Sequence, residues 1–216
     1  MTRDRAGARG NATPDDAAAA GPVRRLPRAR RREQILDAAT RAFARSGFVG
    51  TALDDVAAEA GITRVLLYRH FDSKADLYRA VLDRACARVA DSLGTHDLDH
   101  GAIPALLRAA GADPDGFRLL FRHAAREPEF RELVDTLTAS STEAAQRNLA
   151  RLLPPGPWLD WAARVVPAFT IDAVIGWLDT GRPDPELAAD RISRAVEGII
   201  VAAHPDGEPP ATPRHR

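Results

Sequence analysis

The sequence predicts an all-α protein. Apolar residues recur at helical spacing in successive stretches between residues 28 and 203, and glycine or proline separates these stretches. Alanine is abundant while aromatic residues make up only 6% of the chain, which also favours helix. At 216 residues the chain is long enough for one or two domains with a buried core.

The composition is that of a soluble globular protein, with 45% apolar and 28% charged residues. The formal net charge is zero, so any attraction to nucleic acid must be local. Residues 1–72 carry 13 arginines against 9 acidic residues, which leaves this part positive by four charges and the remainder negative by four. The positive charge therefore gathers in the first third of the chain.

Several classes of protein are excluded by what the sequence lacks. The single cysteine, Cys86, excludes an intramolecular disulfide and an all-cysteine metal site. No apolar run reaches the roughly 20 residues of a membrane span, and the N-terminus does not resemble a secretory signal. We therefore expect a cytoplasmic protein without membrane contact, metal or cofactor. The motifs of common hydrolases, metalloproteases and phosphate-binding loops are also missing, so we expect no enzyme.

Residues 1–27 are predicted to be a disordered arm, because they are rich in Gly, Ala, Pro and Arg and show no periodicity. Arginines cluster at the end of this arm and at the start of the first helix. They either form a solvated tail or lie along DNA phosphates, as basic arms do. The cluster consists of Arg24, Arg25, Arg28, Arg30, Arg31 and Arg32.

The first helix is predicted from about Ala29 to Ser46, with Gly47 placed to end it. It should pack across the next two helices and complete a three-helix module over residues 28–72. Phe43 and Phe71 are interpreted as the core of this module.

The stretch from Thr51 to Lys74 predicts two short helices joined by a tight turn. Its apolar residues form two helical sets, with Gly61 between them. Glycine takes the left-handed conformation that ends many helices, so the turn is only three or four residues long. Such a turn sets the two helices at a steep angle, as in a helix-turn-helix.

Capping residues mark the starts of these helices. Thr51 stands three residues before Asp54, and Ser73 stands three before Asp76, so each pair has the spacing of a capping box. Thr63 is expected to accept a hydrogen bond from the first amides of the second helix.

In a helix-turn-helix the second helix lies in the major groove of DNA, and its N-terminal residues contact base edges. The outward face of that helix here carries Arg64, Leu66, Tyr68, Arg69 and His70. Spacing alone leaves a second interpretation open, namely a small three-helix core with no role in DNA binding.

The motif resembles the TetR family of bacterial transcriptional regulators. The resemblance lies in Thr51, Val56-Ala57, Ala60-Gly61, Ile62-Thr63, Leu67-Tyr68-Arg69-His70-Phe71 and Ser73-Lys74. It covers about the first third of the folded chain and favours the DNA-binding interpretation. With the helix-turn-helix geometry it predicts DNA contacts at Thr51, Thr63, Arg64, Val65, Leu66, Tyr68, Arg69, His70 and Lys74.

Two positions depart from the family pattern. Val65 stands where the family often has Gly, and Leu66 where it often has Thr or Ser. Leu66 has no hydrogen-bonding group for a phosphate or a base, although it is able to touch a thymine methyl. The departure puts the family's usual contact at Leu66 in doubt, but not the docking mode.

Residues 73–203 are predicted to form a larger helical domain, followed by a disordered tail at 204–216. The loop Gly94–Gly101 contains two histidines and two aspartates, which we interpret as a solvated turn, since a loop fixes no metal geometry. The expected helices are Ser73–Leu93, Ile103–Ala110, Gly116–Arg126, Pro128–Leu153, Trp158–Thr180 and Glu186–Ala202.

The last two helices are more apolar than a solvent-facing helix requires. Their apolar stripes either cover the chain's own core or pair with a second chain in a four-helix bundle. The resemblance implies a homodimer through these helices, with two recognition helices about 34–36 Å apart on a pseudo-palindromic site. The stripes contain Val165, Phe169, Val174 and Leu178, then Ile192, Val196 and Ile199.

The resemblance also implies a ligand cavity between the long helices. Its lining would suit a small, mostly hydrophobic effector with one polar group. For each candidate, an ordinary place in the core is the alternative. The candidates are Phe117, Phe121, His123, Trp161, Arg164 and Phe169.

The expected function is that of a ligand-responsive repressor that binds double-stranded DNA as a homodimer. Effector binding would favour a conformer in which the Ser73–Leu93 helix swings and changes the spacing of the two DNA-binding modules. The alternatives are an activator of the same fold and a non-specific DNA-binding or interaction protein that uses the basic arm.

Overall fold

The computed structural model describes residues 27–94 and 101–204, and every element within them is helical, as predicted. The arm at 1–26, the loop at 95–100 and the tail at 205–216 lie outside the described residues, and so do the predictions made for them. The α-helices are α1 Arg28–Gly50, α2 Leu53–Glu59, α3 Arg64–Tyr68, α4 Lys74–Leu93, α5 Ala102–Ala112, α6 Pro114–Arg118, α7 Arg131–Leu149, α8 Pro157–Asp179 and α9 Pro185–Ala203.

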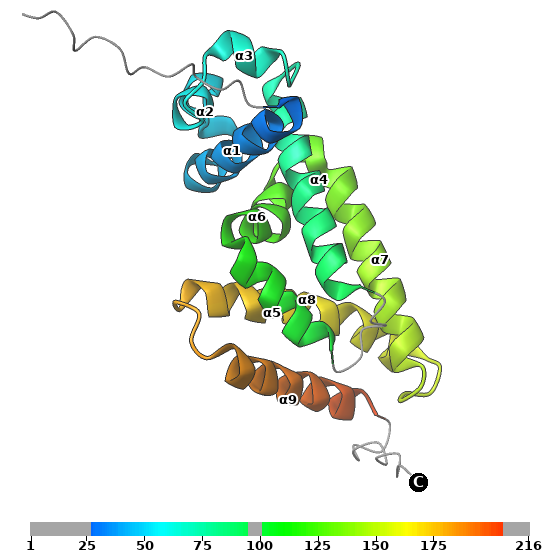
Figure 1. The fold of residues 1–216 in the computed structure, drawn as a ribbon. Helices are drawn as coiled ribbons and strands as arrows, with labels where there is room; N and C mark the ends of the chain where they lie inside the picture. Colours follow the sequence, from blue (N-terminus) through cyan, green and yellow to red (C-terminus); the bar gives the residue numbers. More distant parts are fainter. Residues whose placement is uncertain (1–26, 95–100, 205–216) are drawn as a thin grey trace, which may run out of the picture.

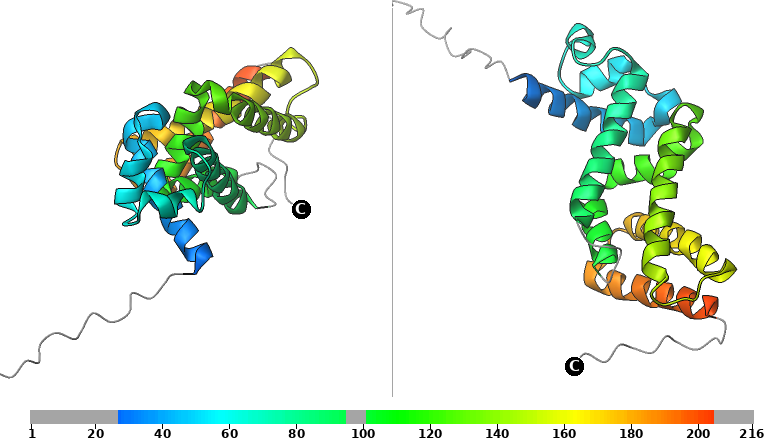
Figure 2. Two further views of the ribbon diagram at one scale, coloured as in Figure 1. Left: turned by 90° about the horizontal axis from the view of Figure 1, so that it is seen from above. Right: turned by 90° about the vertical axis from the view of Figure 1, so that its right-hand side faces the viewer.

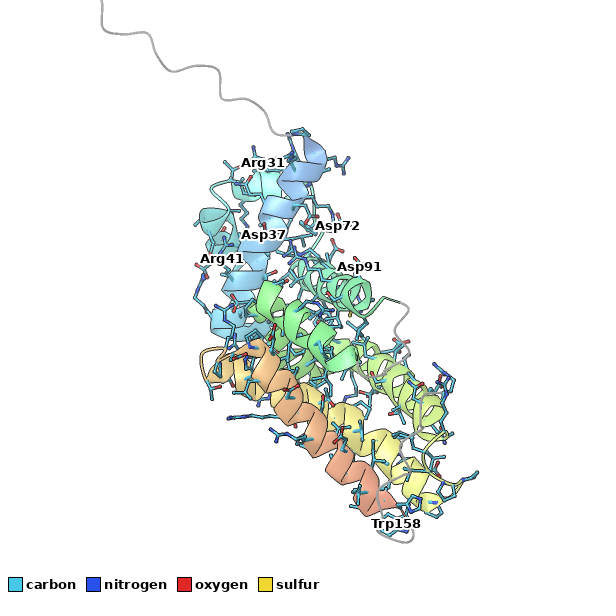
Figure 3. The ribbon with its side chains drawn as sticks, turned by 60° about the horizontal axis from the view of Figure 1, so that its bottom comes forward. Arg31, Asp37, Arg41, Asp72, Asp91 and Trp158 are labelled. Carbon is cyan, nitrogen blue, oxygen red and sulfur yellow. The ribbon has the colours of Figure 1, made fainter. Side chains whose placement is uncertain are left out.

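The molecule is elongated, with different helices at its two ends. Helices α1, α2 and α3 lie at one end and α8 and α9 at the other, while α4 and α7 run between them (Figures 1 and 2). Figure 3 shows Arg31 and Trp158 at opposite ends. The two ends are therefore connected by the long helices α4 and α7.

Helix α1 ends its regular winding where the sequence predicts. Gly47 has φ +70°, a left-handed conformation that glycine adopts without steric cost. One further turn, to Gly50, follows this break. The chain is thus redirected toward α2 at the predicted position.

The first core joins the helix-turn-helix to helices from the following domain. Phe43 and Phe71 are 0% and 1% exposed, which confirms their predicted place in a core. Tyr78 of α4 meets Phe43 at 4.8 Å between ring centroids and Phe130 at 4.7 Å. Phe130 lies in the short 3-10 turn Pro128–Phe130 before α7, so this core crosses residue 72, the expected domain boundary.

Helix α4 is bonded to α1 along one side. The half-buried Arg84 donates to Asp37 at 2.7 Å, to Glu33 at 3.2 Å and to the Thr40 hydroxyl at 2.8 Å. A guanidinium that makes three such bonds holds two helices at a fixed distance. The first turns of α4 and the helix-turn-helix therefore form one body.

The segment predicted as a single helix from Gly116 to Arg126 is divided. After α6 the chain continues as a π turn, Leu119–His123, and a 3-10 turn, Ala124–Arg126. Leu119 and Leu120 of the π turn are both buried in the first core. The Pro128 helix start is confirmed, as a 3-10 turn that leads into α7.

Helix α8 lies between α7 and α9 and contacts both. Among the described helices it alone is long and apolar enough to cross a membrane by length and composition. In the fold, 39% of its most apolar window is buried against protein, and core helices of soluble proteins pass the same test of length and composition. Length and hydropathy are therefore weak grounds for placing it in a membrane.

Candidate functional site

The turn between α2 and α3 has the geometry that the sequence predicts. Gly61 takes φ +63°, and the amide of Ile62 donates to Ala57 O at 2.9 Å. The Thr63 hydroxyl accepts from the amide of Leu66 at 3.3 Å and caps α3. The predicted roles of Gly61 and Thr63 in the turn are confirmed.

Helix α3 turns one side chain inward and presents the others. Leu67 is fully buried in the first core, whereas Val65 is 67% exposed and Tyr68 42% exposed. Arg69 is exposed as well, and Leu66 is half-buried. The predicted recognition face is therefore on the surface of the molecule.

Arg64 is held in a small cluster at the start of α3, which we call the Arg64 cluster and which also contains Asp54 and Tyr68. Its Nη1 donates to Asp54 Oδ2 at 2.8 Å and its Nη2 to the Tyr68 hydroxyl at 3.2 Å. The guanidinium also lies over the Tyr68 ring, 5.5 Å from its centroid. The Tyr68 hydrogen bond and then the Asp54 charge raise the pKa of Arg64, so it is cationic at any physiological pH.

Lys74, at the start of α4, is bonded to the protein itself. Its Nζ donates to Val49 O at 3.3 Å and to Thr51 O at 3.2 Å, and lies 4.7 Å from the Phe48 ring centroid. An ammonium has three donors, so two are used to tie α4 to the segment between α1 and α2. One donor of Lys74 is therefore left for a contact with a DNA phosphate.

Thr51 does not have the capping role expected of it. Its side chain is buried, and the hydroxyl donates to Gly47 O at 2.7 Å and to Ala42 O at 3.2 Å. The N-cap of α2 is Ala52, whose amide donates to Asp55 Oδ2 at 3.3 Å. The predicted capping box between Thr51 and Asp54 is therefore wrong, and a hydroxyl engaged in this way does not face DNA.

The second predicted capping box is half confirmed. The Ser73 hydroxyl accepts from the amide of Asp76 at 3.0 Å, as expected. The reciprocal bond is displaced by one residue, because Asp76 Oδ2 accepts from the amide of Asp72 at 3.1 Å. The start of α4, next to the recognition helix, is fixed by both bonds.

His70 is half-buried at the end of α3. Burial, and then the charges of Arg28, Arg32 and Arg31, lower its pKa. Arginines at the start of α1 therefore lie near enough to His70 to affect it.

At the other end of the molecule, α4, α5, α7, α8 and α9 surround a pocket of about 550 Å³. Its lining extends along α7 from Leu137 to Leu149, which corresponds to about 18 Å of helix. The pocket therefore extends along more than three turns of α7.

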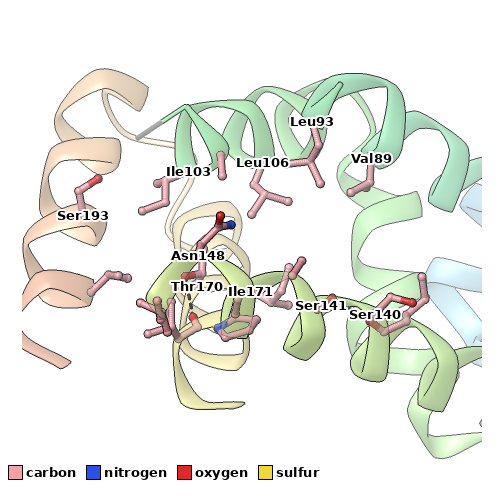
Figure 4. Close-up of a pocket in the computed structure, with 18 of the residues that line it drawn as sticks. Val89, Leu93, Ile103, Leu106, Ser140, Ser141, Asn148, Thr170, Ile171 and Ser193 are labelled. Atoms are coloured by element: carbon pink, nitrogen blue, oxygen red, sulfur yellow. Dashed lines mark hydrogen bonds between the residues drawn. The ribbon is translucent and has the colours of Figure 1, made fainter. Parts of the chain in front are cut away.

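Most of the pocket wall is apolar, and its polar groups are few. Thr170 and Ser141 donate their hydroxyl hydrogens to Val166 O and Leu137 O of their own helices, both at 2.8 Å. Asn148 makes no such side-chain bond, and its amide points into the pocket on the side of Ile103 (Figure 4). Within the described residues, the charged side chains of the lining are Arg151 and Glu197, and both are exposed to solvent.

Comparison with known proteins agrees with the helix-turn-helix geometry at the end formed by α1, α2 and α3. The family described as "Bacterial regulatory proteins, tetR family" matches residues 35–81, which span the turn and the recognition helix. The transcriptional activator FasR of Mycolicibacterium smegmatis is 30% identical over 198 residues, which cover 83% of this chain and 84% of that protein. This chain belongs to the TetR family. It is a DNA-binding transcriptional regulator of that family.

Other TetR-family relatives match over shorter stretches or in fold. The transcriptional repressor SCO4008 of Streptomyces coelicolor is 36% identical over 89 residues, which cover 41% of this chain and 46% of the repressor. A TetR-like regulator from Rhodococcus sp. RHA1 superposes with a TM-score of 0.68 at 24% identity, over 80% of this chain and 96% of its own. The second similarity concerns the fold alone.

Of the predicted pocket residues of this TetR-family regulator, only Phe121 lines the pocket. Phe117 is buried beside it, with ring centroids 4.7 Å apart. Phe117 belongs to a second core, formed by α5, α6, α8 and α9, and Phe169 packs against that core. Trp161 is 38% exposed and Arg164 is exposed, both on the outside of α8. Trp161 and Arg164 therefore lie outside the pocket lining, because the phase of α8 turns them outward.

His123 also lies outside the pocket lining. It is half-buried in the π turn, where burial and then the charges of Arg126, Arg122 and Arg118 lower its pKa. The extra residue in a π turn shifts the direction of the side chains that follow, which a uniform helical period does not foresee.

The stripes predicted for dimerisation are partly internal. Val174, Leu178 and Ile192 are 0%, 5% and 7% exposed and belong to the chain's own second core. The outward faces of α8 and α9 carry other side chains, many of them small. The exposed residues are Pro157, Trp158, Asp160, Trp161, Arg164, Ala168, Asp172, Gly176 and Asp179 on α8, and Pro185, Glu186, Leu187, Asp190, Arg191, Arg194, Ala195, Glu197, Gly198 and Ala202 on α9.

Sequence reasoning missed Asp54 and Asn148 as functional candidates. Asp54 was assigned to a cap, although the ten-residue separation from Arg64 spans the predicted turn and brings it near the recognition helix. Asn148 is a polar residue at an inward position of α7, which was a usable signal. Within residues 27–94 and 101–204 no group of three metal-binding side chains occurs, and His96, Asp97, Asp99 and His100 lie outside them.

Proposed function

We propose that this TetR-family regulator is a ligand-responsive repressor that binds a pseudo-palindromic operator as a homodimer in the cytoplasm. The observation that carries the proposal is the exposed face of α3, with Arg64 at the capped start of the helix and Tyr68 and Arg69 at its end. Arginine and tyrosine supply both base and phosphate contacts in major-groove recognition. The existence of SCO4008 as a repressor within the family supports the direction of regulation.

A competition gel shift tests sequence-specific binding. We expect the protein to shift DNA that flanks its own gene, and to resist displacement by an excess of unlabelled random duplex. Arg69→Ala should weaken binding to all sequences and reduce the salt dependence by about one ion, whereas Arg64→Ala should also relax the preference at one position. Equal displacement by random DNA would show a non-specific binder instead.

The proposed dimer uses the outward faces of α8 and α9. Gly176 and Gly198 have open space where a side chain would extend, so another helix is able to approach both closely. Close packing of small residues suits a helical bundle between two copies. Such a dimer sets the two copies of α3 for successive major grooves.

Light scattering on a sizing column tests this face. We expect a dimer for the natural protein and a monomer for Gly198→Arg, because the long side chain separates the two helices. Glu143→Arg, on the exposed side of α7, is the matched control and should remain dimeric. A dimeric Gly198→Arg protein would place the interface elsewhere.

The proposed effector binds in the long pocket at the far end. A long, mostly apolar pocket with an uncharged amide suits an extended, uncharged molecule with one hydrogen-bonding group. Burying a charge there, away from Arg151 and Glu197 of the lining, would cost several kcal/mol. The pocket volume lies in the range usual for small-molecule sites.

The coupling of effector to DNA is proposed to pass through α4. Cys86 and Val89 line the pocket on one side of this helix, while Arg84 bonds α1 on the other. A ligand that changes the position of α4 therefore moves the helix-turn-helix with it. The effector shifts this equilibrium only by its differential affinity for the two conformers, so DNA must weaken effector binding by the same factor.

A series of ten-carbon probes tests both the class of effector and the coupling. Decanol should raise the melting temperature, whereas decanoate and decyltrimethylammonium, with charged heads on the same chain, should bind about tenfold more weakly or worse. Asn148→Ala should weaken decanol binding about fivefold, and Arg147→Ala, the next and outward residue, should not. Equal decanol affinity with and without operator DNA would exclude the coupling.

Activation is the second candidate, because FasR, the relative with the greater coverage, is named an activator. A reporter driven by the bound promoter separates the two. Deleting the gene should raise expression if the protein represses and lower it if the protein activates.

A further inference from the structure

The Arg64 cluster contains a carboxylate where a DNA-binding surface gains nothing from negative charge. Asp54 stands in the first turn of α2, and its side chain is 64% exposed beside the recognition helix. Phosphates repel such a group, so it lowers the affinity for any duplex. Capping does not account for it, because Asp55 receives the Ala52 amide of α2.

Asp54 and Tyr68 approach Arg64 from two elements and restrict its guanidinium. One acceptor bonds Nη1 and the other bonds Nη2, while the Tyr68 ring lies under the group. A guanidinium has five N–H donors, so three are left for a further partner. An exposed arginine without such contacts samples many rotamers, and fixing them on binding costs entropy.

We propose that Asp54 is a positioning residue for base recognition, which holds Arg64 in the orientation that contacts a guanine in the major groove. Guanine presents two acceptors, O6 and N7, to which arginine bonds in a bidentate way. A guanidinium fixed in advance meets that geometry at little entropic cost and adapts poorly to any other base. Asp54 therefore lowers the overall affinity for DNA and raises the discrimination between sequences.

The inference rests on the proposed operator recognition. It predicts that one substitution, Asp54→Asn, raises the affinity for random duplex and lowers the discrimination between sequences. Asp54→Asn should bind random duplex more tightly, by up to about fivefold, since a negative charge near the phosphates is removed. The same variant should lose about 5- to 100-fold in discrimination against a changed base pair at the Arg64 position, which is the range for one bidentate contact.

The experiment measures the affinities of the full chain for a site selected from a random duplex library and for all single-base variants of that site. Asp72→Asn is the matched control, because it removes an exposed carboxylate from the turn before α4 without touching Arg64. It should raise the affinity for all duplexes alike. In an Arg64→Ala background, Asp54→Asn should change no base preference, because Asp54 acts through Arg64.

Each outcome supports or overturns the role proposed for Asp54. If Asp54→Asn raises the affinity for every duplex equally and leaves the preference at every position unchanged, Asp54 is only a solvated carboxylate and the inference fails alone. If the natural protein shows no preference in the library, operator recognition itself fails. Tyr68→Phe supplies a second variant, which keeps the ring, removes the hydroxyl and should relax the same position. Circular dichroism confirms that each variant is folded.

Discussion

The two ends of the molecule use their polar side chains in different ways. At the DNA-binding end, Arg64, Lys74 and Arg84 are each bonded to groups on neighbouring segments. In the pocket at the other end, the Asn148 amide has no partner among the described residues and most of the wall is apolar. The comparison teaches that geometry is fixed at the surface proposed to meet a DNA groove, and that a bonding group is left open where the proposed effector enters.

The largest expected effect on stability tests whether the DNA-binding module is independent of the domain that follows it. Phe130 follows the DNA-binding module by more than fifty residues, yet it is 1% exposed and lies in the first core. Phe130→Ala should lower the free energy of unfolding by about 3–5 kcal/mol, measured by urea denaturation, and should weaken DNA binding as well. Trp158→Ala, at a 58% exposed aromatic, is the control and should change stability by less than about 1 kcal/mol.

The next effect concerns whether Lys74 binds phosphate or positions the helix-turn-helix. Lys74→Met should lower the free energy of unfolding by about 1–2 kcal/mol, because Val49 O and Thr51 O lose a charged donor. Arg69→Ala should leave stability unchanged while weakening DNA binding. If Lys74→Met weakens DNA binding at full stability, the lysine acts on phosphate alone.

A smaller effect on the free energy of unfolding is expected in the pocket. Unlike Lys74→Met, the substitution there should not lower stability. Asn148→Leu should leave the free energy of unfolding unchanged or raise it by less than about 1 kcal/mol, since an amide without a protein partner is replaced by an apolar group. Chemical denaturation in the absence of ligand measures this. A clear loss of stability would mean that Asn148 supports the fold and is not reserved for a ligand.

The smallest effect is a pH dependence at the DNA-binding end. Hydrogen bonds from Arg45 and then Arg41 lower the pKa of Glu59 from 4.5 to about 2. This carboxylate therefore adds stability that is complete above about pH 4.5 and is lost as the pH falls toward 2. The difference in unfolding free energy between the natural protein and Glu59→Gln should be under about 1 kcal/mol near pH 6 and should vanish near pH 2.

The sequence predicted the helix-turn-helix well because its signals are local. Gly61 ends one helix, Thr63 caps the next, and Leu67 lies on the inward side by helical period alone. The error at Thr51 arose because its hydroxyl is used by Gly47 O of α1, while the N-cap of α2 is Ala52, which has no capping side chain. That bond depends on how α1 approaches, which is set by packing.

The pocket was predicted in kind but not in its residues. The outward side of α8 is marked by Asp160, Arg164 and Asp172, which recur at multiples of four residues and are all exposed. The π turn before α7 adds a change of phase, which moved His123 out of the pocket lining. Such a turn follows from contacts between distant segments, so a single sequence read by period alone does not contain it in usable form.

The place of Phe130 in the first core also has a consequence during synthesis on the ribosome. Tyr78 and Phe48 lack one of their ring partners until residue 130 has left the exit tunnel. Nascent chains acquire structure as segments emerge, and a segment whose apolar contacts are incomplete stays open. The first core, against which the helix-turn-helix packs, is therefore complete only after more than half of the polypeptide has been translated.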